Sequence, residues 1–298
     1  MHLPPNQLAA LAAVLRYGSF ETAATSLHVT QSAISQRIQN LEERVGFILV
    51  ERGAPCTGTK EGIRLAKHAD DLRLLERQAL EDVGVGAAAG PGRVKIAVNA
   101  DSLATWFAPV LRGVDGLLID FMIDDQDHSA DWLRRGVISA AVTAANQNVP
   151  TCDFHDLGAM RYIATASPDF VEQWCRAGVT KETLSGAPMF RFNEKDGLQT
   201  AWLDREFGLK ADPPSQMLPS TQAFVEAVLQ GAGWGMNPAP LIEDHIRHGR
   251  LVALGERPEY DVHLSWQVTR ALAPALSDLT RNVRSAARSV LTENVTPS

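Results

Sequence analysis

The chain has 298 residues, enough for about two or three domains, and its 45% hydrophobic and 21% charged content is ordinary for a globular protein. This composition excludes a disordered, collagen-like or disulfide-framework protein, and no apolar run reaches the roughly 18 to 20 residues of a membrane span. The formal net charge is -7, but residues 1–68 hold seven basic and five acidic side chains, which is compatible with a small nucleic-acid-binding head on an acidic body.

Residues 1–46 contain three apolar helical patterns separated by short turns. The first helix is expected to end at Gly18, where a left-handed cap is favoured, and Ser19 then caps a second helix that ends near His28. Thr30 caps a third helix that runs to Gly46. One face of this helix carries the apolar residues Ile34, Ile38, Leu41 and Val45. A packing face therefore lies opposite a polar face.

Residues 47–59 have the pattern of a β-hairpin wing, in which a β-like run at 47–50 precedes the turn-rich segment 53–59. From Lys60 to about Val85 the pattern is helical again. Its apolar heptad stripe consists of Leu65, Ala69, Leu72, Leu75, Ala79 and Val83. A long helix with such a stripe needs a partner, so we predict that it pairs with its copy from another subunit. Residues 84–92 are small and cannot pack a core, which predicts a hinge.

Beyond the hinge, strand-like runs alternate with helical segments, which favours βαβ units on a mostly parallel sheet. The strands expected for a first lobe are Val94–Val98, Leu117–Ile123 and Ala140–Thr143, with helices near 106–111 and 130–135. A second lobe is expected from strands at 189–192 and 234–236 and helices at 198–207 and 222–229. A strand at 262–268 and a closing helix at 275–291 are expected to return the chain to the first lobe.

The order of helix, short turn, helix and wing is the plan of a winged helix-turn-helix. The segments that fill this plan are FETAA at 20–24, TQSAISQRI at 30–38, LE at 41–42 and Gly46. They resemble the N-terminal signature of LysR-type transcriptional regulators. VNADSLATW at 98–106 and LRRG at 133–136 resemble the ArgP/LysG branch of that family, whose members respond to lysine and arginine. The resemblance covers nearly the whole chain.

The resemblance implies a winged helix-turn-helix DNA-binding domain at residues 1–59 and a linker helix with a hinge at 60–92. It further implies a two-lobed α/β effector domain of the periplasmic-binding-protein type at 93–298. Lobe I is expected at about 93–164 and 262–298, and lobe II at about 165–261. The implied partners are operator DNA, an effector that is lysine or arginine, and further copies of the chain in a dimer or tetramer. RNA polymerase is an additional expected partner.

The polar face of the third helix supplies the expected DNA contacts. Short or amide-bearing side chains hydrogen-bond base edges in a major groove, and this face presents Gln31, Ser32, Ser35, Gln36 and Gln39. Arg37 and Arg52 are expected to contact phosphates. A solvated polar face is the ordinary alternative for an isolated helix, but the preceding helix, the turn and the wing favour DNA contact. The wing has Val50-Glu51-Arg52 where the family usually has Phe-x-Arg, so its contacts depart from the common pattern.

Polar residues stand where predicted strands lead into helices, the place at which open α/β sheets bind ligands. The candidate effector residues are Asp101, Ser102, Asp124 and Asp125 in lobe I and Asn193, Ser220 and Thr221 in lobe II. A helix N-terminus with a serine hydroxyl suits a carboxylate, and the acidic residues are counter-charges for an ammonium or guanidinium group. Ordinary helix caps and a solvated acidic loop are the alternatives.

No catalytic motif in the sequence competes with this interpretation. H-E-x-x-H and G-x-S-x-G do not occur, and Gly231–Gly235 lacks the G-K-[ST] of a phosphate loop. The cysteines form no C-x-x-C pair, so we expect no zinc cluster. Because no catalytic set is present, we expect no enzyme activity, and no metal or cofactor is expected. The N-terminus lacks a signal-peptide pattern, which predicts a cytoplasmic protein. A LysR-type regulator with another effector, a solute-binding protein and an α/β enzyme remain the alternatives.

Overall fold

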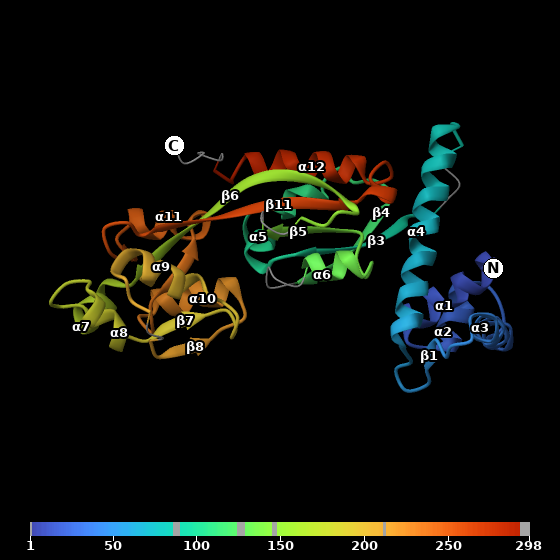
Figure 1. Ribbon diagram of the computed structural model, residues 1–298, viewed down its shortest axis with the longest axis horizontal. Helices are drawn as coiled ribbons and strands as arrows, with labels where there is room; N and C mark the ends of the chain where they lie inside the picture. Colours follow the sequence, from blue (N-terminus) through green and yellow to red (C-terminus); the bar gives the residue numbers. More distant parts are fainter. Residues whose placement is uncertain (1, 86–89, 124–128, 145–147, 211–212, 293–298) are drawn as a thin grey trace.

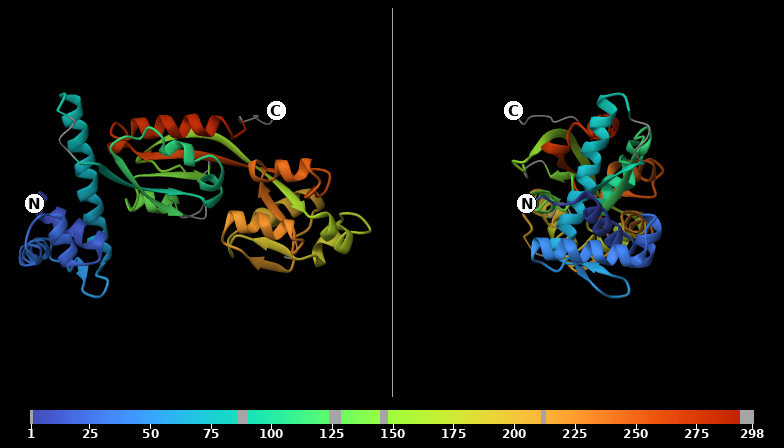
Figure 2. Two further views of the ribbon diagram at one scale, coloured as in Figure 1. Left: turned by 180° about the vertical axis from the view of Figure 1, so that it is seen from behind. Right: turned by 90° about the vertical axis from the view of Figure 1, so that its right-hand side faces the viewer.

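The computed structural model describes residues 2–85, 90–123, 129–144, 148–210 and 213–292, and Figure 1 shows three parts in a row. A small helical head lies at one end beside a long helix, an α/β lobe lies in the middle, and a second lobe lies at the other end (Figures 1 and 2). Within the described residues, no helix is both long enough and apolar enough to cross a membrane.

The head is built from three helices and a two-stranded antiparallel hairpin: α1 (Pro5–Tyr17), α2 (Phe20–Ser26), α3 (Gln31–Val45), β1 (Val50–Glu51) and β2 (Thr57–Gly58). The predicted caps are confirmed. Gly18 has a φ of 64°, and the side chains of Ser19 and Thr30 each accept a backbone hydrogen bond at the start of the following helix. The helical part of the head therefore follows from local signals.

The predicted strand at 47–50 is wrong for most of its length. The Glu42 carboxylate accepts hydrogen bonds from the backbone N–H groups of Leu49 (2.7 Å) and Val50 (3.3 Å), so helix α3 holds this segment. Phe47 and Ile48 stay exposed, and the strand begins only at Val50. The hairpin wing itself is present, but it is shorter than expected.

Helix α4 (Lys60–Asp82) packs on two different parts of the chain (Figure 1). Leu65, Ala69 and Leu72 lie against the core of the head, where α4 contacts α1. Leu74 instead belongs to the core of the middle lobe. Part of the apolar stripe is therefore covered within the chain, and the pairing of α4 with its copy from another subunit stays a prediction. Leu75 remains exposed on the same helix.

One mixed sheet runs through both lobes. Within the described residues it has seven strands: β3 (Gly92–Val98), β4 (Leu117–Ile123), β5 (Ala140–Ala144), β6 (Cys152–Ala166), β9 (Gly235–Pro238), β10 (Val252–Ala253) and β11 (Glu259–Thr269). The order is β10-β6-β11-β5-β3-β4, and β9 pairs with β6. Strand β3 pairs in parallel with β4 and β5, whereas every pair that includes β6 or β11 is antiparallel. The prediction of a mostly parallel sheet, made from the alternation of strands and helices, is therefore wrong.

The long strands β6 and β11 run side by side from the middle lobe into the end lobe (Figures 1 and 2). The expected lobe boundaries, after residue 164 and before residue 262, fall inside these two strands. The lobes are thus joined by a hydrogen-bonded pair of strands. This arrangement differs from two domains that are separated by loops.

Helices cover the sheet in both lobes. Those of lobe I are α5 (Ala100–Thr105), η1 (Ala108–Leu111), α6 (Ser129–Arg134), η2 (Arg270–Leu272) and α12 (Ser277–Arg288). Lobe II contains α7 (Pro168–Trp174), α8 (Lys181–Gly186), α9 (Leu198–Phe207), α10 (Thr221–Leu229) and α11 (Ala239–Arg247), with β7 (Met189–Arg191) and β8 (Ser215–Met217) as a small parallel pair. The sequence patterns did not indicate α7, α8 or α11. The large buried side chains include Trp106, Trp202, Trp234 and Trp266.

Candidate ligand cavity and DNA-contact surface

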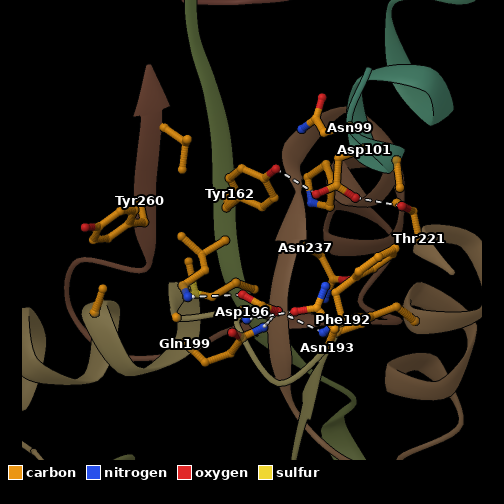
Figure 3. A pocket seen from close by; sticks show the side chains of 18 of the residues that line it. Asn99, Asp101, Tyr162, Phe192, Asn193, Asp196, Gln199, Thr221, Asn237 and Tyr260 are labelled. Carbon is orange, nitrogen blue, oxygen red and sulfur yellow. Dashed lines mark hydrogen bonds between the residues drawn. The ribbon is translucent and has the colours of Figure 1, made fainter. Parts of the chain in front are cut away.

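A cavity of about 320 Å³ lies between the two lobes (Figure 3). The residues after β3 form its lobe I wall, and the crossing strands contribute Tyr162 and Tyr260. Lobe II supplies the segment from 192 to 199, the start of α10 and the end of β9. A cavity of this size, with a few converging polar groups, is typical of a small-molecule site.

Asp101 links the lobes through its carboxylate (Figure 3). Its Oδ2 accepts a hydrogen bond of 2.7 Å from the Tyr162 hydroxyl, and its Oδ1 accepts one of 2.7 Å from the Thr221 hydroxyl. Burial raises the pKa of the Asp101 carboxyl and the charge of Asp196 adds to this, although the two hydroxyl donors act in the opposite direction. An ionised Asp101 is therefore costly unless a cation reaches it.

Asp196 brings a second carboxylate to the cavity. Its Oδ2 accepts hydrogen bonds from Phe192 N (2.8 Å) and Gln199 Nε2 (3.2 Å), and its Oδ1 accepts one from Leu198 N (3.1 Å). The Asn193 side chain folds the same loop, because its Oδ1 accepts from the backbone of Lys195 and Asp196. These bonds hold the loop at the start of α9 in one conformation.

Three buried amide side chains add unpartnered polar atoms to the wall. Neither Oδ1 nor Nδ2 of Asn99 has a hydrogen-bond partner among the described residues, and the same is true of Gln199 Oε1 and Asn237 Oδ1. Their side chains line the cavity and are 5%, 1% and 0% exposed, respectively. Buried polar groups are costly without partners, so these atoms point to a ligand that carries both donors and acceptors.

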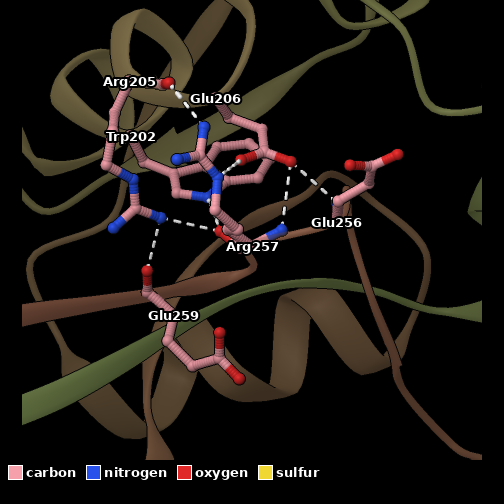
Figure 4. Close-up of polar contacts among 6 residues, drawn as sticks. All are labelled: Trp202, Arg205, Glu206, Glu256, Arg257 and Glu259. Carbon is pink, nitrogen blue, oxygen red and sulfur yellow. Dashed lines mark hydrogen bonds and ion pairs between the residues drawn. The ribbon is translucent and has the colours of Figure 1, made fainter.

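A polar cluster fixes α9 against the start of β11 (Figure 4). The Glu206 side chain is 4% exposed, and its carboxylate accepts hydrogen bonds from the backbone N–H groups of Glu256 (2.7 Å) and Arg257 (3.1 Å). Burial acts to raise the pKa of Glu206, but these N–H groups and the Arg257 guanidinium lower it below its ordinary value. Arg205 donates to the carbonyl oxygens of Arg257 and Glu259. Helix α9 and strand β11 both line the cavity, and these contacts hold the two elements together.

Three of the seven candidate effector residues line the cavity, namely Asp101, Asn193 and Thr221. Ser102 does not line it, because it is packed inside the first turn of α5, where its hydroxyl is fully buried. Ser220 does not line it either, since it is exposed and caps α10 by accepting from Ala223 N. Asp124 and Asp125 lie outside the described residues.

Sequence reasoning missed several polar residues of the wall: Asn99, Tyr162, Asp196, Gln199 and Asn237. Asp196 carried a usable local signal, because Asn193 and Asp196-Gly197 form a cluster of turn residues that ends at a helix start. Tyr162 and Asn237 carried no such signal. They reach the cavity through the antiparallel pairing of β6 with β9.

The polar face of α3 is open to solvent at Gln31, Ser32, Gln36 and Gln39, whereas Ser35 and Arg37 are half-buried. Gln36 Nε2 donates to Asn40 Oδ1 at 2.9 Å, and Gln39 Nε2 donates to Glu43 Oε1 at 3.0 Å. These exposed bonds within one helix are weak, so base edges can replace them. Arg52 stands in the wing with its guanidinium 5.4 Å from the centre of the Phe20 ring.

Two family descriptions match the chain. Residues 5–63 match the bacterial regulatory helix-turn-helix protein of the lysR family, and residues 87–288 match the LysR substrate binding domain. The HTH-type transcriptional regulator LysG of Mycobacterium tuberculosis is 43% identical over 281 residues, which cover 94% of this chain and 92% of that protein. The regulator ArgP of Pseudomonas aeruginosa is 36% identical over 282 residues, which cover 93% of each chain.

Solved structures agree with these relatives. The crystal structure of ArgP from Mycobacterium tuberculosis has a TM-score of 0.81 and 42% identity, with coverage of 99% of this chain and 100% of that one. Full-length LysG from Corynebacterium glutamicum with bound effector Arg has a TM-score of 0.67 and 32% identity, with coverage of 97% and 99%. With matches to its head and to its two-lobed body, the chain belongs to the LysR family of bacterial helix-turn-helix regulators.

Proposed function

We propose that this LysR-type regulator binds operator DNA through α3 and the wing and senses lysine or arginine in the cavity between its lobes. The observation that carries the effector assignment is the pair of carboxylates, Asp101 and Asp196, among unpartnered buried amides. Carboxylates suit the cations of a basic amino acid, and an amide donor suits its carboxylate. The bound arginine of the Corynebacterium glutamicum relative supports the same class of ligand.

The cavity offers a partner for each polar end of such a ligand. The carboxylates of Asp101 and Asp196 accept hydrogen bonds from the ammonium or guanidinium groups, and Gln199 Oε1 and Asn237 Oδ1 are further acceptors. Asn99 Nδ2 is an unpartnered donor for the α-carboxylate. Each charge-assisted bond contributes roughly 1.5 to 3 kcal/mol.

Calorimetric titration of the full-length protein with each of the twenty common amino acids tests this assignment. We expect lysine or arginine to bind, and glutamate and uncharged amino acids of similar length to bind far more weakly. A protein that binds neither lysine nor arginine but binds another metabolite would be a regulator of the same family with a different effector.

The domain roles follow the family plan as part of the proposal. Residues 1–59 form the DNA-binding head, 60–92 the linker helix and hinge, and 93–298 the effector domain. The chain acts in the cytoplasm, where operator DNA is found, as a dimer or tetramer that contacts RNA polymerase. The cavity has the features of a binding site, and we propose that the protein binds its ligand without enzymatic conversion.

Replacing Gln36 by Ala is expected to weaken operator binding by roughly 1 to 3 kcal/mol, because the exposed amide of Gln36 is placed to read a base edge. Non-specific DNA binding should change little. Fluorescence anisotropy with operator and scrambled duplexes at matched salt measures both affinities. The matched variant Arg52→Ala should weaken binding to the two duplexes alike, and a Gln36→Ala protein with wild-type operator affinity would exclude this base contact.

The affinity for arginine is expected to fall with decreasing pH. The loss should begin at a higher pH than it would for an aspartate with an ordinary pKa. Burial raises the pKa of Asp101, and the nearby charge of Asp196 raises it further against the effect of the two hydroxyl donors. The ionised carboxylate binds a cation, so affinity is high above this raised pKa and is lost as the pH falls through it. Titrations between about pH 8 and about pH 4.5 measure the dependence. Constant affinity over that interval would contradict the role of Asp101.

A further inference from the structure

The linker helix α4 carries two arginines that sit on glycine turns of lobe I. Arg64 Nη1 donates to the Gly136 carbonyl oxygen at 2.6 Å, and Arg77 Nη2 donates to the Asp115 carbonyl oxygen at 3.2 Å. A Cβ atom on Gly136 would lie 1.5 Å from Arg64 Nη1, and one on Gly116 would lie 2.0 Å from Arg77 Nη2. Both glycines also have positive φ angles, 60° and 73°. Each turn thus favours glycine for its backbone conformation, and a guanidinium group lies directly against it.

Two further contacts lie between these arginines along the helix. Asp71 Oδ1 accepts a hydrogen bond from the Ser139 hydroxyl at 3.3 Å, and Leu74, which is 2% exposed, packs in the core of lobe I. A Cβ on Gly92 would lie 2.5 Å from Leu74 Cδ2, so strand β3 begins in close contact with the helix. The set of Arg64, Asp71, Leu74 and Arg77, here called the α4 seat, spans about 20 Å of the helix.

The head uses a different side of the same helix. Leu65, Ala69 and Leu72 pack against the head core, whereas Asp70, whose Oδ1 lies 2.8 Å from Arg16 Nη2 of α1, is on the side of the α4 seat. A cavity of about 550 Å³ separates the head from lobe I beside these contacts. Helix α4 is therefore packed on the head with one side and on lobe I with another, and the open space beside it leaves room for a change of angle.

Strand β3 connects the α4 seat to the ligand cavity. It begins at Gly92 next to Leu74 and ends at Val98, directly before Asn99 and Asp101 of the cavity wall. Its seven residues span about 23 Å. A strand in the middle of a hydrogen-bonded sheet is stiff, so a displacement of its carboxyl end moves its amino end as well.

We propose that the α4 seat is the docking surface through which lobe I sets the orientation of the DNA-binding head. Its partner is this chain's own pair of turns, residues 113–117 and 135–139. The transmission of an effector signal through it rests on the function proposed above, whereas the docking contact does not. Loss of the two arginines leaves Leu74 as the main contact and loosens the angle between head and lobe.

The test compares the double variant Arg64→Ala/Arg77→Ala with Arg73→Ala, which removes an exposed arginine from the same helix. Hydrogen–deuterium exchange of the full-length protein without ligand should rise about tenfold at residues 113–117 and 135–139 in the double variant and stay unchanged in the control. Operator affinity with and without arginine is measured in parallel. We expect the double variant to bind arginine within about twofold of the wild type, while the change in operator affinity on adding arginine is lost.

If hydrogen–deuterium exchange at residues 113–117 and 135–139 is as slow in the double variant as in the wild type, the α4 seat is not a docking surface. Raised exchange combined with a wild-type response of operator affinity to arginine would overturn its role in orienting the head. If the wild-type protein binds neither lysine nor arginine, the proposed effector is wrong, but the exchange experiment still decides whether the α4 seat holds lobe I. If the double variant does not fold, Asp71→Ala, which removes the acceptor of the Ser139 hydroxyl, is measured in the same way, with the expected rise confined to 135–139.

Discussion

The Asp101→Asn variant is expected to bind arginine about 10- to 100-fold more weakly than the wild type while remaining folded. The substitution keeps the size of the side chain but removes the charge that a ligand cation needs. Because burial makes the Asp101 charge costly, we expect its removal to leave the protein folded. Calorimetric titration gives the affinity, and urea unfolding gives the stability.

The matched control is Asp169→Asn, which removes an exposed carboxylate from the first turn of α7 in lobe II. Its arginine affinity should equal that of the wild type. If Asp101→Asn and Asp169→Asn both bind arginine like the wild type, Asp101 is not a ligand contact. If Asp101→Asn unfolds, the bridge to Tyr162 and Thr221 is structural and the affinity measurement has to move to Thr221→Val.

Leu72→Glu is expected to lower the free energy of unfolding of the head by about 2 kcal/mol or more. Leu72 packs against the head core, so the substitution places a charge in an apolar contact inside the chain. Chemical unfolding followed by circular dichroism measures the loss. The same variant should weaken DNA binding through disorder of the head, regardless of the oligomeric state.

Leu75→Glu, three residues further along α4, separates this effect from self-association. Leu75 is 38% exposed, so the substitution should change the stability of the isolated chain by less than about 0.5 kcal/mol. If copies of the chain pair through the exposed side of α4, light scattering should show a smaller particle for Leu75→Glu. The opposite pattern, a stable Leu72→Glu protein that dissociates and an unstable Leu75→Glu protein, would contradict the packing of α4 on the head.

The head was predictable because its signals are local. The caps at Ser19 and Thr30 and the left-handed glycine at Gly18 act within a few residues, and the apolar spacing of α3 selects one packing face. The wing was harder to predict, since Glu42 holds the backbone at Leu49 and Val50 from seven and eight residues away. A side chain at that distance is invisible to a short sequence window.

The crossing strands were predictable only in part. Strand β11 was expected over 262–268, near its observed bounds, but β6 was missed. In β6 the residues at 153–156 are exposed or half-buried, whereas the four residues from Leu157 to Met160, which include Gly158 with a φ of 95°, are all buried. Both faces of the strand are covered along this short buried run, whereas Arg161 beyond it is exposed again. A prediction from the local spacing of apolar residues therefore misses this strand.

The cavity illustrates the same limit. Asp101 and Thr221 were predictable, because each stands where a strand or loop leads into a helix. Tyr162 and Asn237 are on strands, and only the register between β6 and β9 brings them together. The wall of the site therefore depends on strand pairing. Without knowledge of that pairing, the sequence predicts only the residues that stand at helix starts.

Strands β6 and β11 form one continuous two-stranded ribbon that belongs to both lobes. The two lobes therefore cannot be separated into independent domains, although the outline of the molecule suggests two. A cut between the lobes would break the chain in the middle of both strands and shorten the hydrogen-bonded ladder that each fragment keeps. Movement between the lobes has to occur by twisting of the ribbon, since stretching or sliding would break its register. Residues 92–292 should consequently melt in a single cooperative transition, and neither lobe is a module that can be exchanged between proteins without its neighbour.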